Sequence, residues 1–401
     1  MAKLCAVIFY ESYLQHWPSF IRDLLQVFCC FSGQTNLSCD LKNVDFVLRV
    51  LLCMDEEIMH GMDNSSCHKE HSTLIKDSMR NGDVVLLGKF WYSILPLHQS
   101  LDSLDILSST LKCISLYVSW MDFSLLFRPE FFEFANVAIK SSCCIKEIVE
   151  CLQEFILKGM NFQEKLNVFQ SLDSSIQYLI EVNKNEEELQ DILTKLINSA
   201  GLELVHLFSQ AKLANTTSSF ETIFNFLFKY LQYSMLFLEP SHQLSLVENL
   251  FPFMQELLDL VKKIDASVSI MLASNFEMFF KLIIFKMKSP KHLLLESYSE
   301  EDLDEEEFSE HRHYLKVLFD SVLRIYPQFL VSTAFQYFST SLNRINSMDI
   351  CELDMLLYLI SICFGDRGYS ATLKEDITEP FKSFLVTLLN SHHISMLNCN
   401  L

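Results

Sequence analysis

The clearest fold signal lies in residues 218–264, which read SSFETIFNFLFKYLQYSMLFLEPSHQLSLVENLFPFMQELLDLVKKI. Ser218 and Glu221 have capping-box spacing, in which two side chains bond the free N–H groups at a helix start. Apolar residues then recur at steps of three and four and so share one helix face. Glu239-Pro240-Ser241 ends this helix and opens a second one with its own apolar stripe. The stretch therefore predicts an antiparallel helix hairpin joined by about three residues.

The same pattern recurs along the chain. Apolar residues at helical spacing, broken by short polar or proline-containing turns, occupy residues 7–28, 104–127 and 315–338. Helix hairpins that follow one another at roughly 40–47 residues are typical of HEAT or armadillo arrays. One hairpin cannot bury its apolar face alone, so neighbours stack into a superhelix with a concave surface. We therefore expect an all-α, HEAT-type helix-hairpin superhelical solenoid over residues 1–401, with about eight or nine helix pairs. A globular helical bundle is the alternative.

Composition supports this fold class. The chain has 401 residues, more than one compact core usually holds. Half of them are hydrophobic, and the eight glycines and eight prolines are too few for the frequent turns of a sheet protein. No apolar run is long enough to predict a membrane span. The 13 cysteines lack regular spacing, which indicates a reducing compartment in which cysteines serve as small buried residues.

Two polar segments interrupt the helical pattern. Residues 59–72 are rich in His, Gly, Asn and Ser, and the sequence predicts a loop there. Residues 296–310 hold nine acidic side chains with few apolar interruptions, and like charges at this density repel one another and extend the chain. We expect a second, acidic loop at this place. It is either a solvated segment that keeps the array soluble or an anionic arm for a basic protein surface.

No motif in the sequence predicts catalysis or metal binding. Cys67, His68 and His71 lie close together, but a zinc site would need a fourth ligand at sensible spacing and none is near. The isolated glycines form no phosphate-binding loop, and no nucleophile elbow or His-Glu-x-x-His helix occurs. We expect no enzyme activity, no catalytic residues, no metal, no cofactor and no small-molecule substrate. A concave helical surface suits large partners instead.

Charge leaves the nature of the partner open. The net charge of −20 is the wrong sign for a simple nucleic-acid binder, yet 31 lysines and arginines remain to form a local basic track. Any of three basic clusters can meet phosphates in the groove, or can simply be solvated surface. The candidate residues for phosphate contact are Lys76, Arg80, Lys158, Lys165, Lys286 and Lys288.

Several stretches resemble one transport family. Residues 13–25, with a Trp-Pro pair at 17–18, are similar to the helix hairpin common to exportins of the importin-β superfamily. Residues 44–57, 73–80 (TLIKDSMR), 117–125 (YVSWMDFSL), 150–160, 315–323 and 338–342 resemble the exportin-T family, the tRNA exportins. The resemblance spans most of the chain and is loosest over residues 181–215.

This resemblance implies a HEAT solenoid that binds tRNA together with the GTP form of the small GTPase Ran. Such a receptor passes nuclear pore proteins, shuttles between nucleus and cytoplasm, and releases tRNA when Ran hydrolyses its GTP. The nucleotide belongs to Ran, so this chain needs no cofactor. An acidic insertion in the middle of the array touches Ran in this superfamily. The residues expected to do so here are Glu300, Glu301, Asp302, Asp304, Glu305, Glu306 and Glu307.

The alignment with this family also suggests that the chain starts at the third repeat and lacks the C-terminal half. The expectation is an export receptor truncated at both ends, or a divergent short form. The alternative function is a protein-binding HEAT scaffold without RNA contact. Charge on the concave face distinguishes the two, because RNA binding needs cations there.

Overall fold

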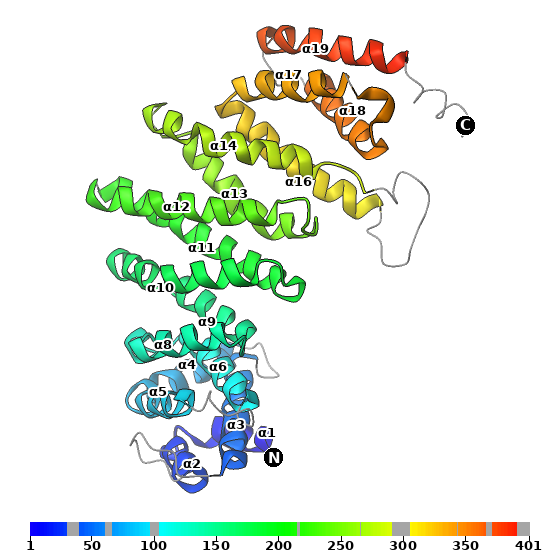
Figure 1. Ribbon diagram of the computed structural model, residues 1–401. Coiled ribbons are helices and arrows are strands. Elements are labelled where there is room, and N and C mark those ends of the chain that lie inside the picture. The colour runs from blue at the N-terminus through cyan, green and yellow to red at the C-terminus, as the bar shows by residue number, and fades with distance from the viewer. Residues whose placement is uncertain are drawn as a thin grey trace. The chain divides into compact units, whose positions relative to one another are not determined.

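The computed structural model describes residues 1–29, 40–60, 66–96, 104–214, 217–264, 266–290, 305–342, 344–365 and 371–390. Every regular element in these ranges is a helix (Figure 1). The chain forms two compact units, residues Met1–Glu203 and Leu204–Leu401. Each unit is a stack of helix pairs, which confirms the prediction of an all-α helical solenoid. The number of HEAT repeats stays a prediction.

Unit 1 contains ten complete helices among its described residues and the start of an eleventh. They are α1 (Ala2–Ser12), α2 (Phe20–Cys29), α3 (Leu41–His60), α4 (Ser66–Arg80), α5 (Asp83–Ile94), α6 (Leu104–Val118), α7 (Phe123–Leu126), α8 (Pro129–Lys140), α9 (Ile145–Leu157), α10 (Phe162–Asn183) and the first part of α11 (Glu187–Ala214).

A row of packed helices forms the core of unit 1. Helix α1 packs on α3, α3 on α6, and α6 on α9 (Figure 1). Buried side chains link successive members of the row: the Cys113 thiol donates to Leu48 O at 3.8 Å, and the Cys151 thiol donates to Leu111 O at 3.2 Å. The same contact thus recurs one helix pair later. Both thiols are buried, which confirms that cysteine acts here as a small core residue.

Unit 2 contains the rest of α11 and the later helices. They are α12 (Thr217–Phe237), α13 (Leu246–Val261), α14 (Ala266–Lys286), α16 (Glu305–Ile325), α17 (Gln328–Leu342), the short 3-10 helix η3 (Ile345–Ser347), α18 (Ile350–Gly365) and α19 (Ala371–Leu389). Helix α16 packs on α13 and α14, and α17 packs on α19. Stacked rings such as Phe280 and Phe319, with centroids 4.9 Å apart, fill the core between α14 and α16. The sequence-predicted hairpin at 218–264 corresponds to α12 and α13.

The prediction of a loop at residues 59–72 is wrong for residues 59–60 and 66–72, which belong to α3 and α4, whereas 61–65 lie outside the described residues. Long-range contacts with α1 explain why a polar stretch is helical. The Tyr10 hydroxyl and His68 Nδ1 are 2.5 Å apart, and His71 Nε2 lies 2.9 Å from Tyr10 O. Polar side chains that are paired in this way can sit at a helix interface.

The prediction of an acidic loop at 296–310 is wrong for residues 305–310, which form the first turns of α16. Glu305, Glu306 and Glu307 are all exposed there. Carboxylates are favoured in a first turn because the helix N-terminus carries a partial positive charge. Residues 296–304, with the predicted Ran contacts Glu300, Glu301, Asp302 and Asp304, lie outside the described part of the chain.

Across the described ranges, no helix is both long enough and apolar enough to cross a membrane.

Candidate functional site

Three of the six predicted phosphate contacts meet at the turn that follows α6. Arg80 donates from Nε and Nη2 to Trp120 O at 3.1 and 2.9 Å. Lys158 Nζ donates to Val118 O at 2.6 Å and Met121 O at 2.8 Å. Lys76 Nζ lies 5.9 Å from the centre of the Trp120 ring. We call Lys76, Arg80, Trp120 and Lys158 the α6 turn site.

The end of α6 explains why cations gather at this site. The last carbonyls of a helix have no partner within the helix, and together they carry a partial negative charge. Lys158 follows α9 directly and reaches back about 40 residues to these carbonyls, so it caps α6 from the next helix pair. Asp122 then starts α7 by accepting from the Ser124 backbone N–H at 2.9 Å. Lys158 thus caps the end of α6, and Asp122 caps the start of α7, on the two sides of the same turn.

At the α6 turn site, burial and the charge of neighbouring cations both disfavour the protonated form of the lysines. Burial lowers the pKa of Lys76 and of Lys158, and the Arg80 charge acts in the same direction on both. Asp55 opposes this effect at Lys76, and Asp122 opposes it at Lys158. The Arg80 side chain is 45% exposed and forms an ion pair with Asp77. An anion that approaches from solvent can therefore reach Arg80, and it would relieve the mutual repulsion of the three cations.

Lys165 and Lys286 are buried helix caps, and this contradicts their prediction as phosphate contacts. Lys165 Nζ donates to Ile156 O and Lys158 O at the end of α9 and pairs with Glu203 at 3.0 Å, and its side chain is 5% exposed. Lys286 is 7% exposed, and its Nζ donates to Glu239 O at 3.0 Å and His242 O at 2.6 Å, in the turn between α12 and α13. Both ammonium groups already have carbonyl acceptors, so phosphates have no access to them.

Burial lowers the pKa of Lys286 to about 8. The two carbonyl hydrogen bonds act in the opposite sense, because they favour the charged form. At pH 7 the ammonium is therefore protonated and caps the turn. We call Lys286 with its two carbonyl acceptors the α12 turn site.

Lys288 remains a candidate for contact with an anionic partner. Its Nζ forms an ion pair with Asp349 at 3.1 Å, and the side chain is half-buried. A half-exposed pair of this kind contributes little to stability and exchanges partners readily.

Arg312 also binds a carbonyl at the end of a helix, and the sequence did not predict this role. Its Nε donates to Met287 O at 3.0 Å, its Nη2 pairs with Asp354 at 2.6 Å, and its guanidinium lies 4.0 Å from the centre of the Tyr358 ring. It lines a cavity of about 360 Å³ beside Glu305 and His313. The partners lie 25 and 42 residues away in sequence, so no local pattern marks this role.

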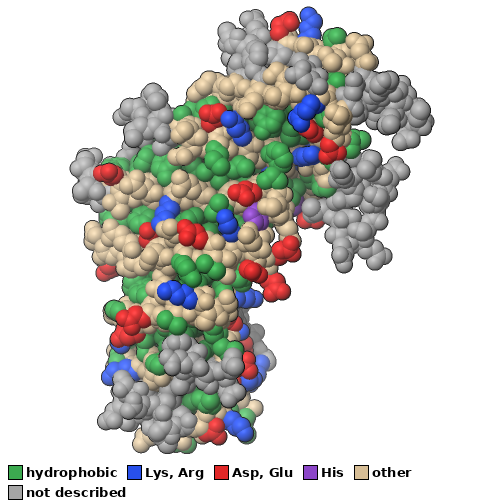
Figure 2. Space-filling model, viewed as in Figure 1, with side chains coloured by type: hydrophobic (Ala, Val, Ile, Leu, Met, Phe, Trp, Pro, Cys, Tyr) green, Lys and Arg blue, Asp and Glu red, His purple; other side chains and the backbone are tan. Residues whose placement is uncertain are grey.

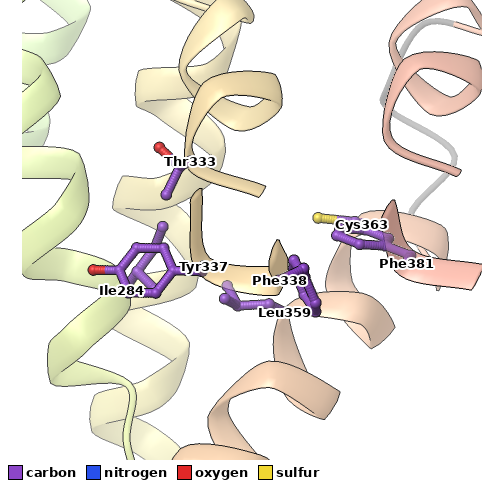
Figure 3. Close-up of a pocket in the computed structure, with 7 residues that line it drawn as sticks. All are labelled: Ile284, Thr333, Tyr337, Phe338, Leu359, Cys363 and Phe381. Atoms are coloured by element: carbon purple, nitrogen blue, oxygen red, sulfur yellow. The ribbon is translucent and has the colours of Figure 1, made fainter. Parts of the chain in front are cut away.

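A small apolar cavity lies between α14, α17, α18 and α19 (Figure 3). Its volume is about 10 Å³, near the minimum that one water molecule needs. Thr333 is buried there, and its hydroxyl has no hydrogen-bond partner among the described residues. The cavity is too small for a substrate. The residues that line it are Ile284, Thr333, Tyr337, Phe338, Leu359, Cys363 and Phe381.

Metal ligands and basic patches are also sparse. Within the described ranges, no three His, Cys, Asp or Glu side chains gather closely enough to hold a metal ion. On the face drawn in Figure 2, lysines and arginines lie singly among acidic side chains instead of forming one basic patch. The α6 turn site is thus a local cluster of three cations.

Comparison with known proteins agrees with this architecture. Residues 1–155 match the family model "Exportin 1-like protein", and residues 215–400 match the model "Exportin-T". A circular tandem repeat protein of known structure aligns over 97% of the chain and 95% of its own length at 13% identity, but the TM-score of 0.30 is too low to bear on the fold.

Relatives named exportin-T come from distant organisms. Human exportin-T is 26% identical over 90% of this chain, the Candida albicans protein is 26% identical over 99%, and the Dictyostelium discoideum protein is 28% identical over 86%. The chain spans 37%, 40% and 30% of the lengths of these three relatives. Both family models and all three relatives carry the name exportin, and together they cover most of the sequence. Over these residues the chain is similar to exportins.

Proposed function

We propose that this chain acts in a nuclear export receptor that binds tRNA together with Ran-GTP. The observation that carries the proposal is the alignment with exportin-T from an animal, a fungus and an amoeba over most of the chain. A stack of helix pairs is the right kind of scaffold, because it offers an extended surface to a large partner. Neither a catalytic centre nor a cofactor is needed for this task.

The α6 turn site is the part of unit 1 that best suits a phosphate contact. Arg80 is half-exposed, carries a planar fork of N–H donors and is pinned by Trp120 O, so it needs little reordering to bind. Lys76 and Lys158 add positive charge beside it. Lys288 offers a second contact in unit 2. Recognition would be electrostatic and based on shape, since phosphate contacts carry no sequence information.

Ran-GTP would bind through acidic residues, of which Glu305, Glu306 and Glu307 form an exposed triplet at the start of α16. Carboxylates suit a basic protein surface and accelerate encounter. The receptor would then pass nuclear pore proteins, shuttle between nucleus and cytoplasm, and release tRNA when Ran hydrolyses its own GTP. The directional step therefore lies in Ran and not in this chain.

Filter binding of the chain to tRNA, with and without Ran-GTP and across salt concentrations, tests the proposal. We expect affinity to fall steeply with salt, because phosphate contacts release counterions. Arg80→Met should weaken binding several-fold and reduce the salt slope by roughly one. Arg49→Met is the matched control, because Arg49 is an exposed arginine that pairs with Asp45 in the preceding turn of α3. Equal losses in both variants would contradict a contact at the α6 turn site.

A protein-binding scaffold without RNA contact is the second candidate. The burial of Lys165 and Lys286 favours it, since two of the six candidate cations serve the fold instead of a ligand. The net charge of −20 acts in the same direction. Binding of Ran-GTP without any tRNA binding at low salt would select this function.

A further inference from the structure

Cys143 and Cys144 place two thiols side by side in the turn between α8 and α9. The Cys143 thiol donates to Cys144 Sγ, and the two sulfurs are 3.6 Å apart. Both side chains are half-buried and therefore within reach of solvent. Ser142 and Cys144 have left-handed backbone conformations, with φ of 54° and 51°. This tight turn holds the two sulfurs on the same side of the chain.

The separation of the sulfurs matches a bridge made by one atom. Two thiolates bound to one tetrahedral zinc at about 2.3 Å lie roughly 3.8 Å apart, close to the distance seen here. A disulfide instead needs a bond of about 2.05 Å and Cα atoms about 4.4–6.8 Å apart. Neighbouring Cα atoms are only about 3.8 Å apart, so a disulfide between these two residues would be strained. A single soft atom can therefore join the sulfurs with less movement than a direct bond.

The surroundings limit such a centre to two protein ligands. No third His, Cys, Asp or Glu completes a metal-binding group among the residues that the structure describes. Cys144 Sγ donates weakly to Leu104 O at 3.9 Å. Glu147, which raises the pKa of Cys144 by its charge, is itself bonded to Ser108 at 2.6 Å. A ligand that brings its own third substituent fits this pair better than a metal ion does.

We propose that Cys143 and Cys144 form a dithiol site that chelates one trivalent arsenic centre carrying an organic group. With phenylarsine oxide, the arsenic–oxygen bonds are replaced by two arsenic–sulfur bonds. The two thiol protons leave with the oxygen as one water molecule, and neither arsenic nor sulfur changes oxidation state. In the product, the segment Cβ–S–As–S–Cβ and the Cys143–Cys144 backbone form one ring. The adduct therefore persists only while both sulfurs stay bound to the arsenic.

The protonation state of the thiols sets the rate of this reaction. Burial raises the pKa of Cys144 to about 12, and the hydrogen bond from Cys143 adds to this effect. The Cys144 thiol is therefore protonated at neutral pH and reacts slowly with reagents that need a single thiolate. Chelation should accelerate as pH rises, because deprotonation precedes bond formation.

Intact mass spectrometry after treatment with one equivalent of phenylarsine oxide tests the proposal. We expect a one-to-one adduct that survives excess monothiol and is removed by a 1,2-dithiol, with peptide mapping that places it at residues 143–144. Cys143→Ser and Cys144→Ser should each reduce the monothiol-resistant adduct at least tenfold. Cys53→Ser, which removes a half-buried cysteine elsewhere, should leave it unchanged.

Thermal unfolding of the untreated variants shows whether each one folds. A loss of adduct in a folded variant then supports the dithiol site. The treated wild-type chain should also unfold at a higher temperature than the untreated one, since a ligand that binds only the folded turn stabilises it. A monothiol-resistant adduct that persists in both serine variants, or maps to another cysteine pair, would overturn the proposal. So would complete removal of the adduct by monothiol.

Discussion

The α6 turn site of unit 1 and the α12 turn site of unit 2 use the same chemistry with different exposure. In each, a lysine from the following helix pair donates to backbone carbonyls at or just after the end of a helix. In unit 1 the lysine is half-buried and shares the turn with Arg80, which remains 45% exposed. In unit 2 Lys286 is 7% exposed.

The difference separates a structural cation from one that is still available to a partner. A buried ammonium between two carbonyls has no surface left for a phosphate, and its whole effect is on folding. A half-exposed guanidinium beside two lysines retains donors and charge toward solvent. The presence of basic residues in a repeat protein therefore does not by itself predict contact with a nucleic acid. Whether nearby carbonyls already bind each cation determines whether it is available to a phosphate.

The largest effect is expected for Lys286→Met. Both turn carbonyls lose the Lys286 ammonium, although Glu239 O still accepts from the His242 N–H, and relief of lysine desolvation offsets part of the lost hydrogen bonding. We expect the free energy of unfolding to fall by about 2 kcal/mol in urea titrations at pH 7. Lys281→Met is the control on the same helix, where an exposed pair with Glu277 is lost and almost no change is expected. Equal stability of both variants would mean that the α12 turn site does not act as a cap.

The second effect concerns pH. The pKa of Lys286 is about 8 in the folded chain against 10.5 for an ordinary lysine, so between these values the unfolded chain holds a proton that the folded chain has lost. Stability conferred by this group therefore rises with pH, by roughly 1.5 kcal/mol between pH 8 and 9.5.

This rise is measured as the difference between wild type and Lys286→Met. Buried tyrosines and cysteines, such as Tyr117 and Cys151, have raised pKa values and act in the opposite direction. They contribute equally to both chains and cancel. A difference that stays constant from pH 8 to 9.5 would contradict a lowered pKa at Lys286.

A smaller effect is expected for Lys158→Met. Lys158 is itself only half-buried, and Arg80 still donates to the same turn. We expect a loss of about 1 kcal/mol in the free energy of unfolding. Lys195→Met removes an exposed pair with Asp191 on α11 and serves as the control. A loss as large as that of Lys286→Met would show that exposure does not distinguish the two turn sites.

The fold could be predicted from the sequence because its signals are local. The apolar stripe of residues 218–264 contains the spacing of α12 and α13, and Ile223, Leu227, Val247 and Leu250 are buried as that spacing predicts. The helical state of residues 66–72 was not predictable in this way. It depends on Tyr10, which is about 58 residues away from His68.

The candidate site was predictable only in part for the same reason. Lys158 and Lys286 find their acceptors 37–47 residues earlier in the chain, one helix pair back. Nothing near either lysine in the sequence distinguishes a cap from a phosphate contact. Resemblance to a family predicted the transport function, whereas the role of each cation required the packing of successive helix pairs.

NMR of the side-chain ammonium groups tests the central claim most directly. In a chain labelled with ¹⁵N-lysine, a hydrogen-bonded and buried ammonium exchanges its protons slowly, whereas exposed ones exchange too fast to be observed. At pH 7 we expect protected Nζ signals that disappear one at a time in Lys165→Met and Lys286→Met, and a weaker one that disappears in Lys158→Met. A spectrum in which no lysine ammonium is protected would contradict the assignment of these cations as helix caps.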